Sequence, residues 1–353
     1  MSITLAQTNR ELKFEPAHQV EPHGQSESCQ TELSLRRELQ TRLRCPACGG
    51  LLQLTPQDYA CLHSGCQRRF QIVEGVPVLI DEGSSVFSLR QALSRPPSAS
   101  ASPWQRFRQR LRNHLPTLSA NPVAAQNIDG FRRLLLEKNP RPSVLVIGGG
   151  WLGAGMQPLL GDSRIDCVET DVWLSDRTDL LCDSHRIPFA SGTFDGAVIQ
   201  AVLEHVADPE QCVREIRRVL KRGGLVYAET AFMQQVHAGR HDLTRFTAVG
   251  HRRLFRGFEQ LDAGAAAGPA VVLAWAWQHF LLSFTTTPAG RAAATVTAAL
   301  TAFWLKYLDR VLLAKPAALD AASACYFLGT RQERELTDRD ALAAYRGAQH
   351  DVV

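Results

Sequence analysis

Short apolar runs alternate with helical patterns along the chain from Ser143 onward. The run from Val144 to Ile147 is wholly apolar and precedes a glycine cluster, and further apolar runs follow in RIDCVETDVW, TFDGAVIQ and LVYAETAF. Before the last of these runs, the segment from Asp208 to Gly223 has apolar residues at helical spacing, an aspartate as N-cap, a proline at the first helical position and a glycine as its stop. This alternation predicts an α/β fold with a mostly parallel sheet and helices on both faces.

The segments around this core have different patterns. Residues 1–40 are polar and lack hydrophobic periodicity, so they cannot bury enough apolar area to offset ordering entropy, and we expect a disordered tail. Residues 41–85 form a small module with four cysteines. Residues 86–125 contain RPPSASASP, which is typical of a linker, and WQRFRQRLRNHL, which predicts a basic amphipathic helix. The main domain is therefore expected at 126–335, followed by a tail at 336–353.

A long uncharged stretch lies near the end of the main domain. Residues 263–290 contain no Asp, Glu, Lys or Arg, and 292–305 are similarly uncharged. The apolar part, AVVLAWAWQHFLLSF, is shorter than the ~20 residues needed to cross a bilayer. We therefore expect no transmembrane span but a helical insertion at about 269–318, between a sixth strand near FEQLDAG and a seventh strand, SACYFLGT. It is predicted to cover the sheet edge or the substrate mouth, with dimerisation or peripheral membrane contact as alternatives.

Charge and cysteine content narrow the function classes only slightly. The 353 residues carry 39 basic and 35 acidic side chains, and a net charge of +4 does not by itself require a nucleic-acid partner. The first residues lack the basic start and apolar run of a secretory signal. The nine cysteines are odd in number and unevenly placed. We therefore expect a cytoplasmic protein without disulfides.

The four-cysteine module has the spacing of a metal site. Cys45 and Cys48 form a C-x-x-C pair, and Cys61 and Cys66 form a second pair with four intervening residues, which leaves His63 as an alternative ligand. Two such pairs can present four thiolates tetrahedrally to a zinc ion. With the ending GVPVLID, the stretch 43–81 resembles the small zinc-ribbon family that activates tRNA and protein methyltransferases. The resemblance implies a structural zinc and a scaffolding role.

The glycine-rich turn after the first strand is a weak signal alone, because it fits a nucleotide site or a plain loop. Downstream, Asp171 ends a second strand, where a carboxylate can accept hydrogen bonds from the hydroxyls of a ribose. Asp183 ends a third strand in DLLCDSHRIPF. The blocks TFDGAV, VLEHVADPE and EIRRVLKRGG then follow in order.

Together, these blocks resemble class I S-adenosylmethionine-dependent methyltransferases of the type 11 group, over residues 140–260. The resemblance implies a Rossmann-like, seven-stranded sheet and S-adenosylmethionine as cofactor. By position, it implies that Gly148, Gly150 and Gly153 contact the methionine part of the cofactor and that Asp171 binds its ribose. It also implies that Asp183 and Ser184 lie by the adenine and that Gln200 and Ala201 lie beside the sulfonium. The chain departs from the group at the end of the first strand, where Val146 and Ile147 stand in place of an acidic residue.

Candidate catalytic residues follow the fourth and fifth strands. A hydroxyl acceptor must lose its proton during methyl transfer, so His241 and Asp242 are predicted as a base pair in the substrate site. Alternatively, Asp242 only pairs with Arg245 or caps the next helix. A third candidate is His205, for which packing is the favoured alternative. The pattern H-D-x-x-R-F-T resembles one found in methyltransferases encoded with polysaccharide-assembly genes, which implies a small-molecule or glycan hydroxyl as acceptor.

Two other functions stay open at this point. Zinc ribbon plus methyltransferase resembles the zinc-containing 23S rRNA guanine methyltransferases, which implies an rRNA or tRNA base as substrate and the ribbon as RNA contact. The modest net charge argues against RNA. The uncharged stretch leaves open, as a further alternative, a membrane-associated methyltransferase acting on a lipid-linked substrate.

Overall fold

The computed structural model describes residues 33–94 and 115–348. Most of the expected tail at 1–40, and almost all of the predicted basic helix in WQRFRQRLRNHL, lie outside the described residues. The expected tail ends earlier than predicted, because Arg37–Gln40 forms the short helix α1 and Leu35 and Leu39 are buried. At the other end, the expected tail from 336 contains helix α12, Asp338–Ala343.

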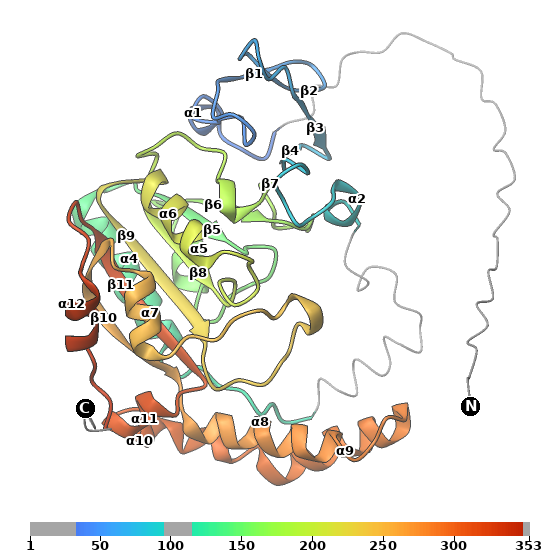
Figure 1. Cartoon of the computed structure of the whole chain (residues 1–353), viewed down its shortest axis with the longest axis vertical. Helices are drawn as coiled ribbons and strands as arrows, with labels where there is room; N and C mark the ends of the chain where they lie inside the picture. Colours follow the sequence, from blue (N-terminus) through green and yellow to red (C-terminus); the bar gives the residue numbers. More distant parts are fainter. Residues whose placement is uncertain (1–32, 95–114, 349–353) are drawn as a thin grey trace, which may run out of the picture. The chain divides into compact units, whose positions relative to one another are not determined.

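A single mixed sheet organises the fold (Figure 1). Its eleven strands follow the order β1-β2-β3-β4-β7-β6-β5-β8-β9-β11-β10. Their bounds are Leu52–Leu54 (β1), Asp58–Cys61 (β2), Arg69–Val73 (β3), Val76–Leu79 (β4), Ser143–Ile147 (β5), Asp166–Asp171 (β6), Leu180–Cys182 (β7), Phe194–Gln200 (β8), Leu220–Ala231 (β9), Phe258–Ala267 (β10) and Ala324–Arg331 (β11).

The predicted count of seven mostly parallel strands is wrong for the sheet as a whole. Strands β4, β7, β6, β5, β8 and β9 pair in parallel, whereas β1 to β4 and β9, β11 and β10 pair antiparallel. The difference arises at β7, which would be an edge strand with unpaired backbone groups. Strand β4 pairs with it, Val78 with Leu181 and Leu79 with Cys182, so the cysteine module extends the sheet.

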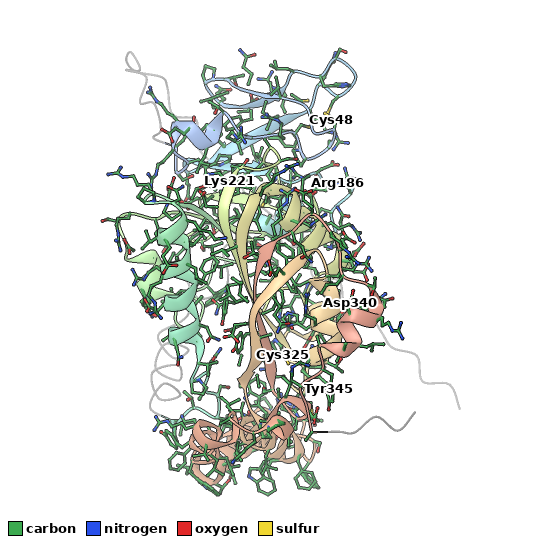
Figure 2. The ribbon with its side chains drawn as sticks, turned by 90° about the vertical axis from the view of Figure 1, so that its left-hand side faces the viewer. Cys48, Arg186, Lys221, Cys325, Asp340 and Tyr345 are labelled. Carbon is green, nitrogen blue, oxygen red and sulfur yellow. The ribbon has the colours of Figure 1, made fainter. Side chains whose placement is uncertain are left out.

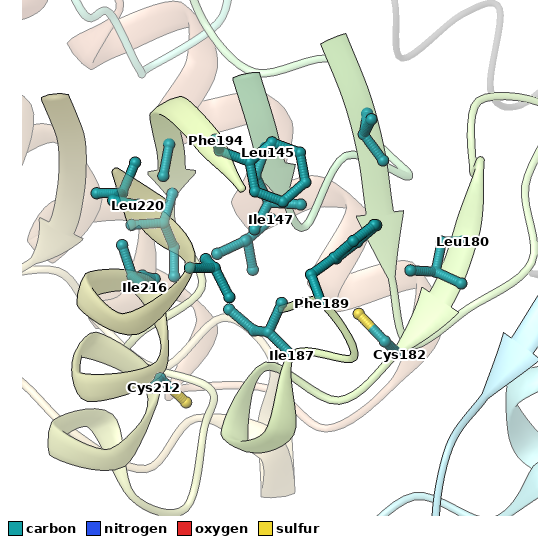
Figure 3. Close-up of a cluster of buried hydrophobic side chains, with 14 of the residues drawn as sticks. Leu145, Ile147, Leu180, Cys182, Ile187, Phe189, Phe194, Cys212, Ile216 and Leu220 are labelled. Carbon is teal, nitrogen blue, oxygen red and sulfur yellow. The ribbon is translucent and has the colours of Figure 1, made fainter. Parts of the chain in front are cut away.

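Helices cover both faces of the central strands, which explains why β5 is apolar at nearly every position. On one face, Leu145 and Ile147 belong to a cluster that includes Ile216 of α6, Pro209–Val219 (Figure 3). On the other face, Val144 and Val146 pack with residues of α4, Ala124–Lys138. Both clusters anchor the strand whose end leads into the glycine turn.

Helix α6 begins as the sequence predicts but ends earlier. Asp208 is its N-cap, with Oδ1 accepting a hydrogen bond from the N–H of Gln211 at 2.9 Å, and Pro209 is its first residue. The helix ends at Val219 rather than at the expected stop, Gly223. The next residue, Leu220, is buried and already pairs with Phe194 as the first residue of β9, so the helix cannot continue through it. Gly223 therefore lies within β9, with φ +69°.

The cysteine module packs on the central domain through main-chain and side-chain contacts. Leu43 and Phe189 form an antiparallel bridge. The Arg186 side chain of the central domain donates a hydrogen bond to the carbonyl of Ala47 in the module at 3.3 Å (Figure 2, where Arg186 and the neighbouring Cys48 are labelled). Leu43, Tyr59 and Phe70 share one hydrophobic cluster with Phe194 of the central sheet. The module therefore shares its core with the rest of the fold.

Helices lie between β10 and β11, in the segment where an insertion is expected. They are α8 Pro269–Leu282, α9 Pro288–Ala302, α10 Asp309–Leu312 and α11 Pro316–Asp320. Figure 1 shows α8 and α9 side by side, and the two helices pack on each other. None of the helices in the described part of the chain is both long and apolar enough to cross a membrane.

Candidate active site

A cavity of about 650 Å³ opens at the carboxyl ends of β5, β6 and β8. Open α/β sheets bind ligands at this edge. Most of the residues predicted for the site line the cavity: Gly148, Gly153, Asp171, Ser184, Gln200, Ala201, His205 and His241. Three predicted residues, Gly150, Asp183 and Asp242, do not line it.

The glycine turn is packed against the loop that follows β8. Gly148 has φ +75°, and a Cβ at this position would collide with Val202. A Cβ on Gly153 would collide with the side-chain oxygen of Gln200. Ala201 itself has φ +52°, a conformation that non-glycine residues seldom adopt and that is often found at functional sites. Because these residues have no side chain or only a small one, main-chain atoms form this part of the cavity wall, and a ligand can approach the main chain closely.

Asp171, at the end of β6, is held by three backbone donors. Its Oδ2 accepts from the N–H of Gly150 at 2.9 Å, and its Oδ1 accepts from Val172 at 2.7 Å and Trp173 at 3.2 Å. Burial raises the pKa of Asp171, whereas these N–H groups act to lower it. A carboxylate offers about four acceptor sites, so one remains for a ligand. Gly150 thus acts by positioning Asp171 and not as part of the cavity wall.

Asp183 is engaged away from the cavity, contrary to its expected place beside the adenine. Its carboxylate accepts from the Oγ of Ser85 at 2.5 Å and from Nδ1 of His185 at 2.6 Å. Burial tends to raise the pKa of Asp183, but the bonds from His185 and Ser85 outweigh it and the pKa lies below its usual value. Nε2 of His185 accepts from the N–H of Asp208 at 3.0 Å. Asp183 therefore ties the last residue of the cysteine module to the start of α6, and of these two predicted residues only Ser184 lines the cavity.

Three imidazoles reach the cavity, from the loops after β8 and β9: His205, His237 and His241. Nδ1 of His205 is 3.0 Å from the carbonyl oxygen of His241, and the His205 and His237 rings lie 4.9 Å apart between centroids. The His241 ring stacks at 6.3 Å on Phe87. These contacts join both loops at the mouth of the cavity.

Asp242 is not a free base in this structure, which corrects its predicted catalytic role. Its side chain is fully buried and forms an ion pair with both terminal nitrogens of Arg245, one at 2.7 Å. It also accepts from the N–H of His237 at 2.9 Å. The Arg245 guanidinium holds the pKa of Asp242 well below its usual range, so this carboxylate does not take up a proton near neutral pH. Asp242 positions the loop that carries His237 and His241.

Two residues lining the cavity lack a distinctive motif. Glu229, near the end of β9, is buried, and its carboxylate accepts from the side-chain amide of Asn121 at 3.0 Å. Burial raises the pKa of Glu229. An acidic residue inside the apolar run LVYAETAF is the signal that identifies it. No such signal marks Phe87, because it reaches the cavity from the segment after the cysteine module only through tertiary folding.

Glu204, His205 and His237 bring three potential metal-ligand atoms within 4.8 Å of one another. Glu204 is buried, Oε1 accepts from the N–H of Ala231 at 3.3 Å, and Oε2 has no hydrogen-bond partner among the residues that the structure describes. Nδ1 of His237 is 3.2 Å from the carbonyl of Gln235, so the Nδ1 atoms of both histidines face carbonyl oxygens and their Nε2 atoms are left as acceptors. This donor set suits a divalent cation.

The four predicted cysteines converge in the module. The Sγ atoms of Cys45, Cys48, Cys61 and Cys66 all lie within 4.8 Å of one another, as a tetrahedral zinc site requires. The N–H of Gly50 donates to Sγ of Cys48 at 3.4 Å and lowers the pKa of that thiol, which favours the thiolate form of a ligand. His63, the alternative ligand, is not part of this cluster among the described residues.

Comparisons with known proteins identify one domain. A family model described as a methyltransferase domain matches residues 165–228, which include β6 to β8, α6 and most of β9. A curated relative, an uncharacterized 37.1 kDa protein in transposon TN4556 of Streptomyces fradiae, is 50% identical over 44 residues. The matched segment is 12% of this chain and 13% of that protein.

Solved structures resemble the chain at low identity. A sarcosine dimethylglycine methyltransferase structure from Galdieria sulphuraria aligns with 13% identity and a TM-score of 0.41, covering 65% of this chain and 98% of that one. A chain from the complex of the Haloferax volcanii Trm112 methyltransferase activator with a methyltransferase aligns with 18% identity and a TM-score of 0.36, covering 61% and 96%. Phosphoethanolamine N-methyltransferase 2 of Haemonchus contortus aligns with 12% identity and a TM-score of 0.37, covering 58% and 53%. Similarities of this size carry no information on the substrate.

Proposed function

We propose that this chain, a methyltransferase by its matched domain, transfers the methyl group of S-adenosylmethionine to a hydroxyl group of a small molecule or glycan. The observation that carries the proposal is the placement of Asp171 and three imidazoles around one cavity. The carboxylate can recognise the nucleoside, and the imidazoles can take up a proton.

The cavity fits the proposed cofactor. A volume of about 650 Å³ lies within the range of small-molecule sites. One acceptor position of the Asp171 carboxylate remains for a ribose hydroxyl, and the backbone of Gly148 and Gly153 forms the neighbouring wall. Gln200 ends β8 and Ala201 follows it, on the other side of β5 from Asp171. We propose that the reacting methyl group lies beside these two residues.

The reaction requires alignment and removal of one proton. When bound, S-adenosylmethionine would supply the methyl group: the acceptor oxygen would bond to the methyl carbon, and the electron pair of the broken carbon–sulfur bond would stay on sulfur. Positioning supplies most of the acceleration, since a sulfonium is already a strong electrophile. We assign the acceptor proton to His241, with His205 bound to its carbonyl and Asp242 holding the loop through Arg245.

We also propose that the cysteine cluster holds a structural zinc ion. All four ligands come from the protein, so the ion has no open position for a substrate. Its place is in a module whose strands continue the central sheet, which supports a scaffolding role. The alternative of an rRNA or tRNA base as substrate gains no specific support from the described residues.

Replacing His241 by alanine is expected to lower kcat for a hydroxyl acceptor by about 10²- to 10⁴-fold, the usual contribution of a general base. Affinity for S-adenosylmethionine should not change. The measurement is methyl transfer to a panel of sugar nucleotides and glycans, compared with ribosomal RNA and tRNA. His63→Ala, an exposed histidine of the cysteine module that is not part of the thiol cluster among the described residues, is the control.

Labelling of RNA alone, with activity that falls steeply as salt rises, would contradict the hydroxyl proposal in favour of the RNA alternative. Labelling of glycans with undiminished turnover in His241→Ala would leave the substrate class standing and remove His241 as the base.

A further inference from the structure

Helix α8 exposes a stripe of large apolar side chains. Leu273, Trp277 and Phe280 follow one another at intervals of four and three residues, which places them on one side of the helix, and Phe284 follows just beyond the helix end with its ring centroid 5.0 Å from that of Phe280. Their exposed fractions are 57%, 37%, 55% and 74%. The adjoining side, with Ala270, Val271 and Ala274, is buried. The helix is therefore apolar on the side that faces solvent as well as on the side that faces the protein.

A second stripe begins in α9 and continues beyond it. Val296, Leu300, Trp304, Tyr307 and Val311 have the same helical spacing and exposed fractions of 38%, 58%, 50%, 48% and 67%. The indole N–H of Trp277 donates to the exposed Thr301 hydroxyl at 2.9 Å, so the two stripes meet at the surface. We call the two stripes together the apolar face. Contiguous exposed apolar surface of this extent marks a binding surface.

The charges around the apolar face are of one sign. The charged residues of 269–318 are Arg291, Lys306, Asp309, Arg310 and Lys315. Asp309, the sole acidic residue of the segment, is fully buried and caps the start of α8, accepting from the N–H groups of Gly268 and Ala270 at 3.0 Å. Within 269–318, the exposed charges are therefore all positive.

We propose that the apolar face docks on an anionic lipid bilayer. The aromatic side chains would enter the boundary between headgroups and acyl chains, and the basic side chains would contact lipid phosphates. No described helix can cross a membrane, so the helices lie in the interface and do not span it. A second copy of the chain fits less well, because pairing two such faces would bring like charges together.

Helix α8 lies between this surface and the candidate active site and contacts the site with its opposite side. The Trp275 ring of α8 lies 6.4 Å from the ring of His237, which lines the cavity. The Trp275 indole also donates to the hydroxyl of Ser119 at 2.8 Å, which fixes the ring at this position. Resting on the proposed function, docking through α8 would hold the cavity about one helix diameter from the bilayer, which points to an acceptor hydroxyl on a lipid-linked molecule.

The test is flotation of the full chain with vesicles, in the absence of any methyl donor. We expect binding to vesicles of phosphatidylcholine plus phosphatidylglycerol, weaker binding to phosphatidylcholine alone, and loss of binding as salt rises. Phe280→Ser/Phe284→Ser/Trp304→Ser should lower the partition coefficient about tenfold or more. Arg291→Glu/Arg310→Glu/Lys315→Glu should lower it about fivefold or more for each basic side chain removed.

Matched controls change the same properties elsewhere. Leu51→Ser/Leu62→Ser/Leu342→Ser removes three exposed apolar side chains, and Arg37→Glu/Arg90→Glu/Arg141→Glu reverses three exposed arginines. Both should bind vesicles like the wild type. Calorimetry with S-adenosylmethionine, expected to be the same for every variant, shows that each one is folded.

Equal vesicle binding by the serine variant and the wild type would overturn the docking proposal. An absence of wild-type binding to vesicles would also overturn it. Light scattering would then distinguish a dimer, which the serine variant dissociates, from a monomer, whose apolar face another segment of the chain would cover. Docking without methylation of any lipid-linked hydroxyl would remove the substrate class and leave the surface. Failure of cofactor binding would count against the proposed function alone.

Discussion

Asp171→Ala is expected to weaken binding of S-adenosylmethionine by about tenfold to a hundredfold. Loss of a hydrogen bond from a ribose hydroxyl to an ionised carboxylate costs about 1.5 to 3 kcal/mol, which corresponds to that change in affinity. The substitution also leaves the N–H groups of Gly150, Val172 and Trp173 without their acceptor, so the neighbouring glycine turn loses its support. Calorimetric titration of the wild type and the variant measures the effect.

Asp176→Ala provides the matched control, because Asp176 is an exposed aspartate in the loop that follows β6. Its affinity should equal that of the wild type. Binding of S-adenosylmethionine to Asp171→Ala with wild-type affinity would remove Asp171 from the cofactor site. No binding to the wild-type chain would remove the cofactor proposal itself.

Cys48→Ser is expected to release one equivalent of zinc and to destabilise the whole fold. Cys48 is exposed, so the change removes a ligand without opening a cavity in the core. Binding of structural zinc contributes about 10 to 16 kcal/mol to small zinc domains, an amount comparable to the total stability of a typical domain. Strand β4 pairs with β7, and Tyr59 and Phe70 share a core with the central sheet, so the loss should pass beyond the module.

Elemental analysis and thermal unfolding measure this outcome. Affinity for S-adenosylmethionine should also fall, because Phe87 lines the cavity and Ser85 binds Asp183. Cys167→Ser, a cysteine of β6 outside the cluster, should retain its zinc and serves as the control. Wild-type protein that contains no zinc and yet has a folded module would contradict the proposed metal site.

Local patterns in the sequence were sufficient for the central strands, for the start of α6 and for the four cysteines. Each depends on neighbours along the chain: a continuous apolar run for a strand buried on both faces, a capping aspartate followed by proline, and paired thiols on short turns. The same holds for Asp171, since a carboxylate directly after a parallel strand lies at the ligand-binding edge wherever the strand is placed. These residues are arranged as the sequence predicts.

The roles of Asp183, Asp242 and Phe87 were decided only by tertiary contacts. Asp183 meets Ser85 across 98 residues of sequence, and no spacing rule describes such a pair. Asp242 and Arg245 are close in sequence, but whether the carboxylate is free or paired depends on how its loop folds over the cavity. Strand count changed for the same reason, since pairing of β4 with β7 depends on an available sheet edge and not on a local pattern. Sequence periodicity thus determined which segments are strands, helices and ligand-bearing turns, whereas tertiary packing decided which polar groups are left free to act.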